Sequence, residues 1–291
     1  QVGRSRQRFQ IMKEISGVNH RSGLEVVIVG AGMIGLSAAY FLQRLGATVM
    51  LLERSFVGDC IPNLELKRVL AYCKGTQTGE LTERGLMLAE ELAGELGYVG
   101  SLQDIEGEPY IDDAKSPNGK RAILLSDFAR DLAVHCQQAG VRVIEANPVS
   151  SLLMKQNVVH GAVTATGSIV ADEVVICAGL QSVGLIGAIG LSLQLKAAEN
   201  QLGASSARQG IPGVFTGKVP LTPTGAPYIG RPVGFDGLYL AIGHDTNPAA
   251  AIAVGEMIAE ALYRSEDVFA LSLGRVDYSA NQSSDPLNNA L

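Results

Sequence analysis

The pattern of apolar and polar positions near the N-terminus predicts a strand, a helix and a second strand. Residues 24–29 form an apolar run, LEVVIV, and residues 33–45 carry apolar side chains at helical spacing. Gly46 follows directly, at the position where a glycine commonly ends a helix. Residues 47–52, ATVMLL, form another buried run that stops at Glu53. Because such units have right-handed crossovers, we expect the two strands to be parallel and adjacent.

The rest of the chain continues this mixture of patterns. Helical spacing is found in residues 80–96, 126–139 and 247–263. Short apolar runs predict strands at residues 141–144, 151–154, 158–164, 169–179 and 238–243. Ser126 is the expected N-cap of the second helix, and Asn247 with Pro248 the expected start of the last one. Turn residues at 166–168 indicate an antiparallel meander, residues 220–232 are turn-dense, and residues 196–218 predict a loop.

These elements predict an α/β fold with a central parallel sheet and a β-meander. With 47% apolar and 18% charged residues, the composition excludes a disordered or coiled-coil protein, and 34 glycines without a regular period exclude collagen. The formal charge is −6 and there is no long basic block, so the sequence carries no electrostatic footprint for nucleic acid.

The four cysteines, Cys60, Cys73, Cys136 and Cys177, are too widely spaced for a zinc-ligand pattern or a small disulfide scaffold. We therefore expect reduced thiols and no metal site. Two uncharged stretches, residues 26–42 and 174–195, contain several glycines and are better explained as buried strand–turn–helix units than as membrane spans.

The first 22 residues are basic, which weakly resembles an organelle presequence, but a flexible leader is the favoured interpretation. The composition and the expected reduced cysteines predict a cytoplasmic protein. Organelle targeting by the basic N-terminus is left open.

Gly30-Ala31-Gly32-Met33-Ile34-Gly35 is a GxGxxG pattern between a predicted strand and a predicted helix. The first glycine permits the sharp turn, the second lets backbone N–H groups approach a pyrophosphate, and the third allows close packing of helix and strand. Glu53 ends the next strand, where its carboxylate would accept hydrogen bonds from an adenosine ribose and disfavour a 2′-phosphate. The alternative is a packing turn without a ligand, and the motif does not distinguish FAD from NAD.

Three further segments, read in order, resemble the FAD-dependent D-amino-acid oxidase superfamily, especially its glycine oxidase and sarcosine oxidase branch. They are residues 26–54, the block from 124–149 through 169–182 (IVADEVVICAGLQS), and residues 222–247 (TPTGAPYIGRP to GLYLAIGHDTN) with the helix that follows. The resemblance implies a GR2-type flavoprotein: a Rossmann-like FAD-binding domain with a small, reduced α+β substrate region.

The resemblance also implies where FAD is held. The backbone of Val149 would meet the adenine, although a core strand residue is the alternative. Ala178 and Gly179 would lie beside the ADP moiety, and the start of the last helix would face the flavin ring. The expected cofactor residues are Gly30, Ala31, Gly32, Met33, Ile34, Gly35, Glu53, Arg54, Val149, Ala178, Gly179, Gly243, His244, Asp245, Thr246 and Asn247.

A discontinuous FAD-binding domain is expected at residues 23–59, 122–195 and 219–265. Residues 60–121 and 196–218 are the expected substrate region, residues 1–22 the leader, and residues 266–291 a peripheral tail.

Three features depart from the resemblance. Residues 55–63, SFVGDCIPN, keep little of the family's serine- and glycine-rich loop, and Val219 stands where the family has the arginine that binds the substrate carboxylate. The substrate region is also short, which leaves two alternatives open: a reduced domain, or a printed chain that omits some stretches.

The leading hypothesis is a FAD-dependent oxidase or dehydrogenase of a small amine or amino acid. Hydride would pass from the substrate Cα to flavin N5, leaving an imine that hydrolyses, with oxygen or another electron acceptor. Candidate catalytic residues are Tyr228, Arg231 and His244, although a histidine satisfied within its turn is as good an interpretation of His244. The alternative is a FAD-binding subunit of a multi-subunit amino-acid dehydrogenase or oxidase, which requires a partner subunit. An NAD-linked dehydrogenase is the third hypothesis.

Overall fold

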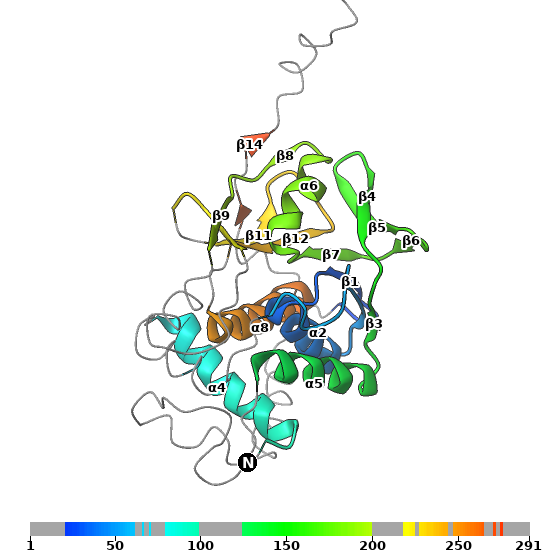
Figure 1. Cartoon of the computed structure of the whole chain (residues 1–291). Helices are drawn as coiled ribbons and strands as arrows, with labels where there is room; N and C mark the ends of the chain where they lie inside the picture. The colour runs from blue at the N-terminus through cyan, green and yellow to red at the C-terminus, as the bar shows by residue number, and fades with distance from the viewer. Residues whose placement is uncertain are drawn as a thin grey trace, which may run out of the picture.

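A seven-stranded sheet runs through the middle of the computed structural model (Figure 1). The structure describes residues 21–61, 66, 70, 79–98, 124–199, 218–224, 227–243, 247–264, 270–271 and 274–275. In spatial order the strands are β13 (Ala270–Leu271), β11 (Tyr228–Pro232), β12 (Leu238–Ile242), β7 (Glu173–Ile176), β1 (Glu25–Val29), β2 (Thr48–Leu52) and β3 (Arg142–Ile144).

Strands β12, β7, β1, β2 and β3 are all parallel, whereas β11 is antiparallel to β12. The expected parallel pairing of the first two strands is therefore confirmed. The carboxyl ends of the parallel strands meet at one edge of the sheet, which we call the carboxyl edge. Gly30, Glu53, Cys177 and Gly243 each follow a strand at this edge.

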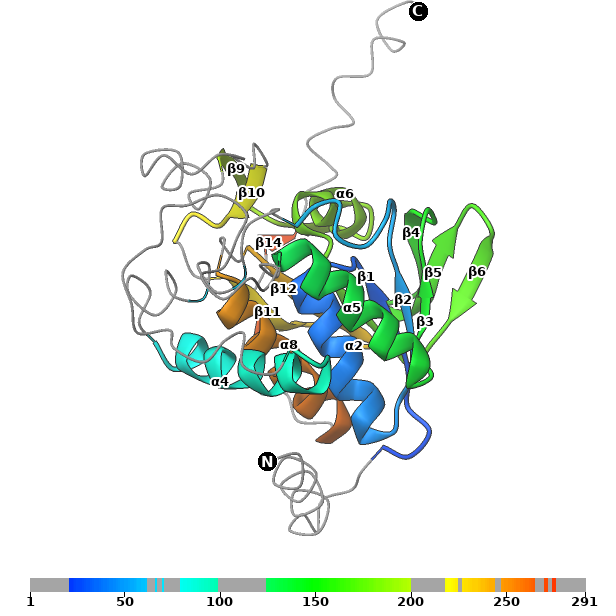
Figure 2. The same cartoon turned by 60° about the horizontal axis from the view of Figure 1, so that its bottom comes forward.

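The two faces of the sheet bury different residues of the same strands, because successive side chains of a strand point to opposite faces. Val26 and Ile28 belong to one hydrophobic core, while Val27 and Val29 belong to another. Four helices cover the first face (Figure 2): α2 (Met33–Leu45), α4 (Glu80–Glu95), α5 (Leu125–Gln138) and α8 (Pro248–Arg264).

The second face is covered by the meander and by a short helix. The meander consists of β4 (Val149–Lys155), β5 (Val158–Thr164) and β6 (Gly167–Val170) in antiparallel order, as the sequence predicts. The helix is α6 (Ser182–Gly187), which follows the 3-10 turn η1 (Gly179–Gln181). Two small sheets complete the fold: β9 (Lys196–Glu199) with β10 (Lys218–Leu221), and β8 (Leu191–Ser192) with β14 (Gly274–Arg275).

Helices α2 and α8 pack backbone against backbone. A Cβ added at Gly255 of α8 would lie 2.4 Å from the Cβ of Ser37 and 2.6 Å from the nitrogen of Ala38, both on α2. In the same way, a Cβ at Gly85 of α4 would lie 1.7 Å from the carbonyl oxygen of Ala249 in the first turn of α8. Glycine is required at both crossings, since the helix axes approach closer than any side chain permits.

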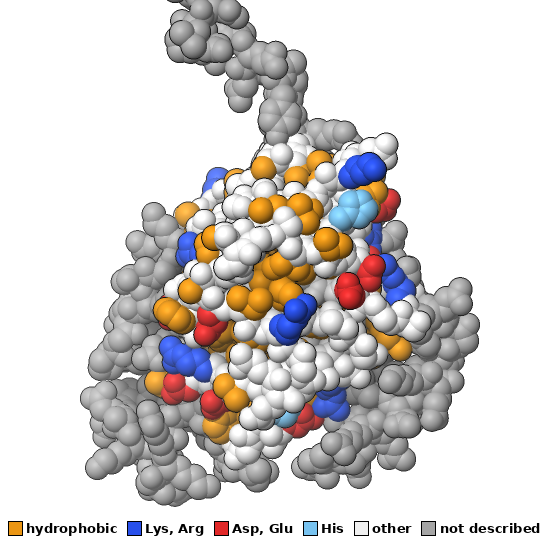
Figure 3. Space-filling model, turned by 90° about the vertical axis from the view of Figure 1, so that its right-hand side faces the viewer, with side chains coloured by type: hydrophobic (Ala, Val, Ile, Leu, Met, Phe, Trp, Pro, Cys, Tyr) orange, Lys and Arg blue, Asp and Glu red, His pale blue; other side chains and the backbone are white. Residues whose placement is uncertain are grey.

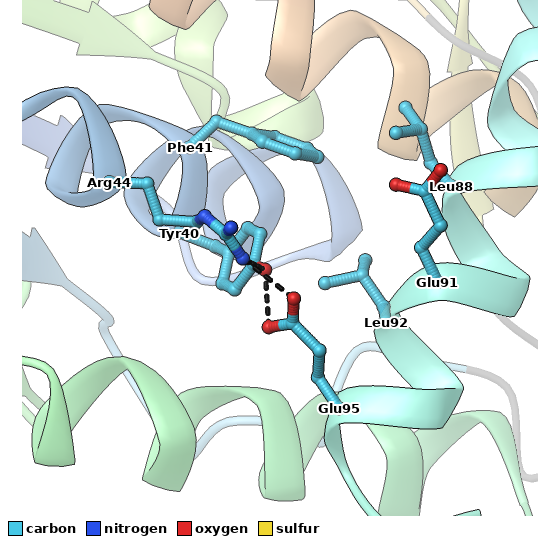
Figure 4. Close-up of a pocket in the computed structure, with 7 residues that line it drawn as sticks. All are labelled: Tyr40, Phe41, Arg44, Leu88, Glu91, Leu92 and Glu95. Atoms are coloured by element: carbon cyan, nitrogen blue, oxygen red, sulfur yellow. Dashed lines mark hydrogen bonds and ion pairs between the residues drawn. The ribbon is translucent and has the colours of Figure 1, made fainter. Parts of the chain in front are cut away.

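A polar cluster ties α2 to α4 (Figure 4). The Tyr40 hydroxyl donates to Oε2 of Glu95 at 2.5 Å, and Arg44 donates to Oε1 of the same carboxylate at 2.7 Å and to the Tyr40 hydroxyl. Burial, and the hydrogen bond to Glu95 next, raise the pKa of the Tyr40 phenol above its usual range, so this group stays protonated. The cluster lies on the second half of α2, away from its N-terminus.

Several local predictions need correction. Ser126 is not a cap: it lies inside α5, whose N-cap is Leu124, and no side chain caps this helix. The predicted strand at residues 169–179 is two strands, because the chain passes from the meander into the central sheet between Val170 and Glu173. The predicted loop at residues 196–218 begins with β9, whose partner β10 is distant in sequence.

The helix at residues 80–96 was expected in the substrate region. Leu88, Ala89 and Leu92 of α4 lie in the same core as α2 and α8. The division of the chain into domains stays a prediction.

Cys60, Cys136 and Cys177 are free thiols, as expected. Among the described residues there is no cluster of metal-ligating side chains, and none of their helices is both long and apolar enough to cross a membrane. The face viewed in Figure 3 mixes apolar and charged side chains. Cys73, most of the expected leader, the predicted sites at 244–246 and most of the expected C-terminal tail lie outside the described residues.

The α2–α8 crossing gives a prediction about stability. Replacing a glycine inside a helix by alanine ordinarily stabilises a protein by up to about 1 kcal/mol. We expect G255A instead to destabilise the fold by about 1–3 kcal/mol, because the new methyl group meets the backbone of α2. G94A is the matched control, since a Cβ at Gly94 meets nothing within 4 Å. Urea unfolding of both variants tests this, and equal stability of G255A and G94A would contradict the packing described.

Candidate cofactor site

The turn after β1 is built by two glycines that are packed against the neighbouring backbone. Gly30 has φ +105°, and a Cβ there would lie 2.7 Å from the carbonyl oxygen of Cys177. A Cβ at Gly35 would lie 2.0 Å from the carbonyl oxygen of Gly30. These two positions accept only glycine, because the helix start and the ends of two strands meet there.

Gly32 is different, since a Cβ at this position would meet nothing within 4 Å. It is the N-cap residue of α2, and no side chain caps this helix end. The first turn of α2 contains no acidic residue. A helix start with uncapped N–H groups and open space in front of it can bind an anion such as a pyrophosphate.

The carboxylate of Glu53 lies beside this turn. Its Oε2 accepts a hydrogen bond from the Ala31 N–H at 2.9 Å, and its Oε1 accepts one from the Ser55 N–H at 3.0 Å. The two backbone bonds fix the side chain, and each oxygen retains a lone pair for a further donor. The carboxylate of Glu53, which is the predicted partner of the ribose hydroxyls, is thus held in one orientation next to the glycine turn.

The turn between β3 and β4 is joined to the end of β2. The Asn147 N–H donates to the Glu53 carbonyl at 2.9 Å, and the Ala146 N–H donates to the Ser55 carbonyl at 2.8 Å. Val149 follows two residues later at the start of β4 and is half-buried. Val149, the expected neighbour of the adenine, therefore lies at the same edge of the sheet as Glu53.

Cys177 joins the third strand end to the glycine turn. Its N–H donates to the Val29 carbonyl at 3.0 Å, and its thiol lies 3.3 Å from the carbonyl oxygens of Val29 and Gly30. Burial, and then the charge of Glu53, raise the pKa of this thiol to about 12, so it stays neutral.

Ala178 and Gly179 follow Cys177. Ala178 packs against the Gly30 turn, and Gly179 has φ +58° with open space around its Cβ position. The backbone at Gly179 is therefore open to a ligand, and its place beside the ADP moiety stays a prediction.

The N-terminus of α8 is also at the carboxyl edge. Oδ1 of Asn247 accepts from the Ala250 N–H at 2.9 Å, which confirms this residue as the N-cap. Its Nδ2 donates to the Thr82 hydroxyl of α4 at 2.9 Å, and this bond fixes which way the amide points. Gly243, with φ +88°, would place a Cβ 2.6 Å from Thr222.

The two catalytic candidates that the structure describes, Tyr228 and Arg231, lie at opposite ends of strand β11. Tyr228 is paired with Ile242 at the carboxyl edge, next to Gly243. Arg231 is paired through both terminal nitrogens with Glu173 at 3.1 Å, and Glu173 begins β7 at the opposite edge. Arg21 binds the same carboxylate at 2.5 Å. The assignment of Arg231 as a substrate contact is therefore corrected: this residue neutralises a buried carboxylate.

Both α2 and α8 follow parallel strands and cover the same face, so both begin at the carboxyl edge. Their crossing at Ser37 and Gly255 is four residues from the start of α2 and seven from the start of α8. At 1.5 Å per residue, the two helix starts are about 6 and 10 Å from the crossing. An extended dinucleotide can reach from one to the other.

The sequence profile of the family described as "FAD dependent oxidoreductase" matches residues 25–98, which span β1, α2, β2 and α4. These residues are similar to that family, whose description names FAD. The match therefore favours FAD over NAD, a choice that the glycine motif leaves open.

Solved flavoprotein structures have the same fold. Glycine oxidase from Geobacillus kaustophilus superposes with a TM-score of 0.62 at 18% identity, covering 89% of this chain and 100% of that one. L-proline dehydrogenase from P. horikoshii gives a TM-score of 0.59 at 16% identity, covering 84% of this chain and 94% of that one. At these identities the likeness establishes the fold alone.

A comparison with curated proteins finds relatives of another kind. Thiamine thiazole synthases of Saccharolobus islandicus and Saccharolobus solfataricus are 26% identical over 136 residues, which is 46% of this chain. The match spans 41% of the length of those relatives.

The residues at the carboxyl edge fit the ADP part of FAD. Backbone is open to a ligand at Gly32 and Gly179, and a fixed carboxylate lies between them and the β3–β4 turn. Two buried polar atoms of this region, Nδ2 of Asn147 and Oγ of Ser182, also have no hydrogen-bond partner within the described part of the chain. Sequence patterns did not single out these two residues, because neither belongs to the glycine motif.

Alanine substitutions at the open Gly32 and at the tightly packed Gly35 should have different effects. We expect G32A to leave the stability of the ligand-free protein unchanged, since the methyl group enters open space, but to weaken FAD binding by at least about tenfold by occupying the pyrophosphate position. G35A should instead destabilise the fold. Thermal melting and FAD titration of both variants separate the two effects, and unimpaired FAD binding by G32A would contradict this position for the pyrophosphate.

The role of Arg231 gives a second prediction. R231M should lower the free energy of unfolding by about 2 kcal/mol, because Glu173 is 4% exposed and, of its partners among the described residues, would keep only Arg21. FAD affinity should not change. R142M, at an exposed position of β3, is the control. A weaker FAD complex with unchanged stability would show that Arg231 acts in the site after all.

Proposed function

We propose that this protein is a FAD-dependent oxidoreductase that oxidises a C–N bond of a small amine or amino acid. The observation that carries the proposal is the meeting of the glycine turn, Glu53 and the starts of α2 and α8 at one edge of the sheet. The names of the fold relatives, glycine oxidase and L-proline dehydrogenase among them, support the class of substrate.

Bound FAD supplies the redox chemistry by accepting two electrons from the substrate carbon as an imine forms and later hydrolyses. The protein has to bind, orient and exclude water. The uncapped start of α2 neutralises the pyrophosphate, and Glu53 accepts from the ribose hydroxyls. The start of α8 directs positive helix-dipole charge toward negative charge that develops in the flavin ring, and Thr82 holds the capping Asn247 in the orientation that this requires.

Tyr228 is the proposed substrate contact among the described residues. This residue is half-buried beside Gly243 and lies at the carboxyl edge. His244, the other remaining candidate, and the cofactor candidates Asp245 and Thr246 follow Gly243 directly in sequence. Arg54 is proposed only as a neighbour of the ribose-binding carboxylate.

A FAD-binding subunit without its own substrate site is the second candidate. The observation in its favour is the pairing of Arg231 with Glu173, which removes one candidate substrate contact. In addition, Val219 stands where the family has the arginine that binds the substrate carboxylate. In this case oxidation of an amino acid would require a partner subunit.

Anaerobic reduction of the FAD-loaded chain distinguishes the candidates. Glycine, sarcosine, proline and several D-amino acids are added one at a time, and the visible flavin absorbance is followed. Bleaching by one of them is the expected result, and its rate identifies the preferred substrate. Bleaching only after addition of a partner fraction selects the subunit. Failure of the purified chain to bind FAD at all would overturn both candidates, and binding of NAD in its place would favour a dehydrogenase.

A further inference from the structure

A buried hydrogen-bond donor at the carboxyl edge has no acceptor among the residues that the structure describes. Asn147 is 3% exposed, and its side-chain nitrogen Nδ2 is buried without a partner. Buried polar groups are almost always hydrogen-bonded, because a group that loses its bonds to water and gains none destabilises the fold. This amide therefore requires an explanation.

The location of Asn147 relates it to the cofactor site. Its backbone N–H donates to the carbonyl of Glu53, the residue whose carboxylate is held beside the glycine turn. Val149, the expected adenine neighbour, is two residues further along the chain. Asn147 thus lies between the positions proposed for the ribose and the adenine.

The other half of the amide has a defined neighbour. Oδ1 of Asn147 accepts from the Thr166 hydroxyl at 3.3 Å, in the turn between β5 and β6. Oxygen and nitrogen point in different directions from the amide carbon, so this bond turns Nδ2 away from the meander. The bond is long, and the Thr166 hydroxyl has Thr164 Oγ1 at 3.0 Å as another partner. Because the last side-chain torsion of asparagine is soft, the amide can turn toward an incoming acceptor at small cost.

The backbone before Asn147 is unusual as well. Ala146 has φ +51°, one of two positive values at described non-glycine residues. Its N–H donates to the Ser55 carbonyl at 2.8 Å, so the tight turn is held against the end of β2. Unfavourable backbone angles persist where the surroundings enforce them, often at ligand sites. The turn places the asparagine next to Glu53.

We propose that the side-chain amide of Asn147 donates a hydrogen bond to the adenosine half of FAD, at an acceptor of the ribose or the adenine ring. The inference rests on the proposed use of FAD. Glu53 accepts from the ribose hydroxyls, and Asn147 supplies the complementary donor. The two residues together select ligands that contain adenosine over flavins that lack it.

Titration calorimetry of the ligand-free full chain with FAD, ADP and FMN tests this proposal. N147L removes the donor while keeping a similar side-chain volume. We expect it to bind FAD and ADP about tenfold more weakly, by the same factor for both, because the lost contact is in the half that they share. The melting temperature without ligand should not fall, since the substitution removes an unsatisfied buried group.

Two control variants separate binding from general damage. T166V removes the neighbour of Oδ1, and N157L changes an exposed asparagine in the turn between β4 and β5. Both should bind FAD and ADP within twofold of the unmodified chain. N147S, whose shorter hydroxyl does not reach the position of Nδ2, replaces N147L if that variant does not fold.

The outcomes distinguish this inference from the function on which it rests. Unchanged affinity of N147L for ADP overturns the role of Asn147 but leaves the FAD site intact. Loss of FAD affinity without loss of ADP affinity also overturns it, because the contact would then lie outside the adenosine half. If the unmodified chain binds neither FAD nor ADP, the proposed function itself fails.

Discussion

The structure depends on the close backbone contact between the end of β1, the end of β7 and the start of α2. Gly30 and Gly35 leave no room for a side chain, and the Cys177 thiol lies against the carbonyls of Val29 and Gly30. This contact sets the position of the α2 N-terminus relative to the sheet. The carboxylate of Glu53 then lies beside the open Gly32, because it accepts a hydrogen bond from the neighbouring Ala31 N–H.

The second helix start is positioned by the same kind of contact. α8 crosses α2 at its own Gly255, and it crosses α4 at Gly85 of α4. At both crossings the neighbouring helix lies so close that a Cβ on the glycine would overlap with its backbone. Thr82 then orients the capping Asn247. The site is therefore assembled from segments distant in sequence, which close packing at these crossings holds together.

Local signals in the sequence were sufficient for much of this arrangement. The helix at residues 33–45 with its glycine stop, the Asn247 cap and the parallel pair of first strands are confirmed, since each depends on neighbouring residues or on a short crossover. The role of Arg231 and the strand β9 were predicted wrongly, because each depends on a partner outside its own sequence segment. These partners are Glu173 for Arg231 and β10 for β9. No short sequence pattern predicts an unpartnered buried amide such as that of Asn147, because its burial depends on the turns packed around it in the folded chain.

The central claim is that one FAD extends from the glycine turn to the start of α8. A crystal structure of the full chain with bound FAD tests it most directly. The account predicts the pyrophosphate over Gly32, the ribose at Glu53 and the flavin ring against the turn before Asn247. A flavin ring directed away from α8, or a pyrophosphate bound elsewhere, would contradict it.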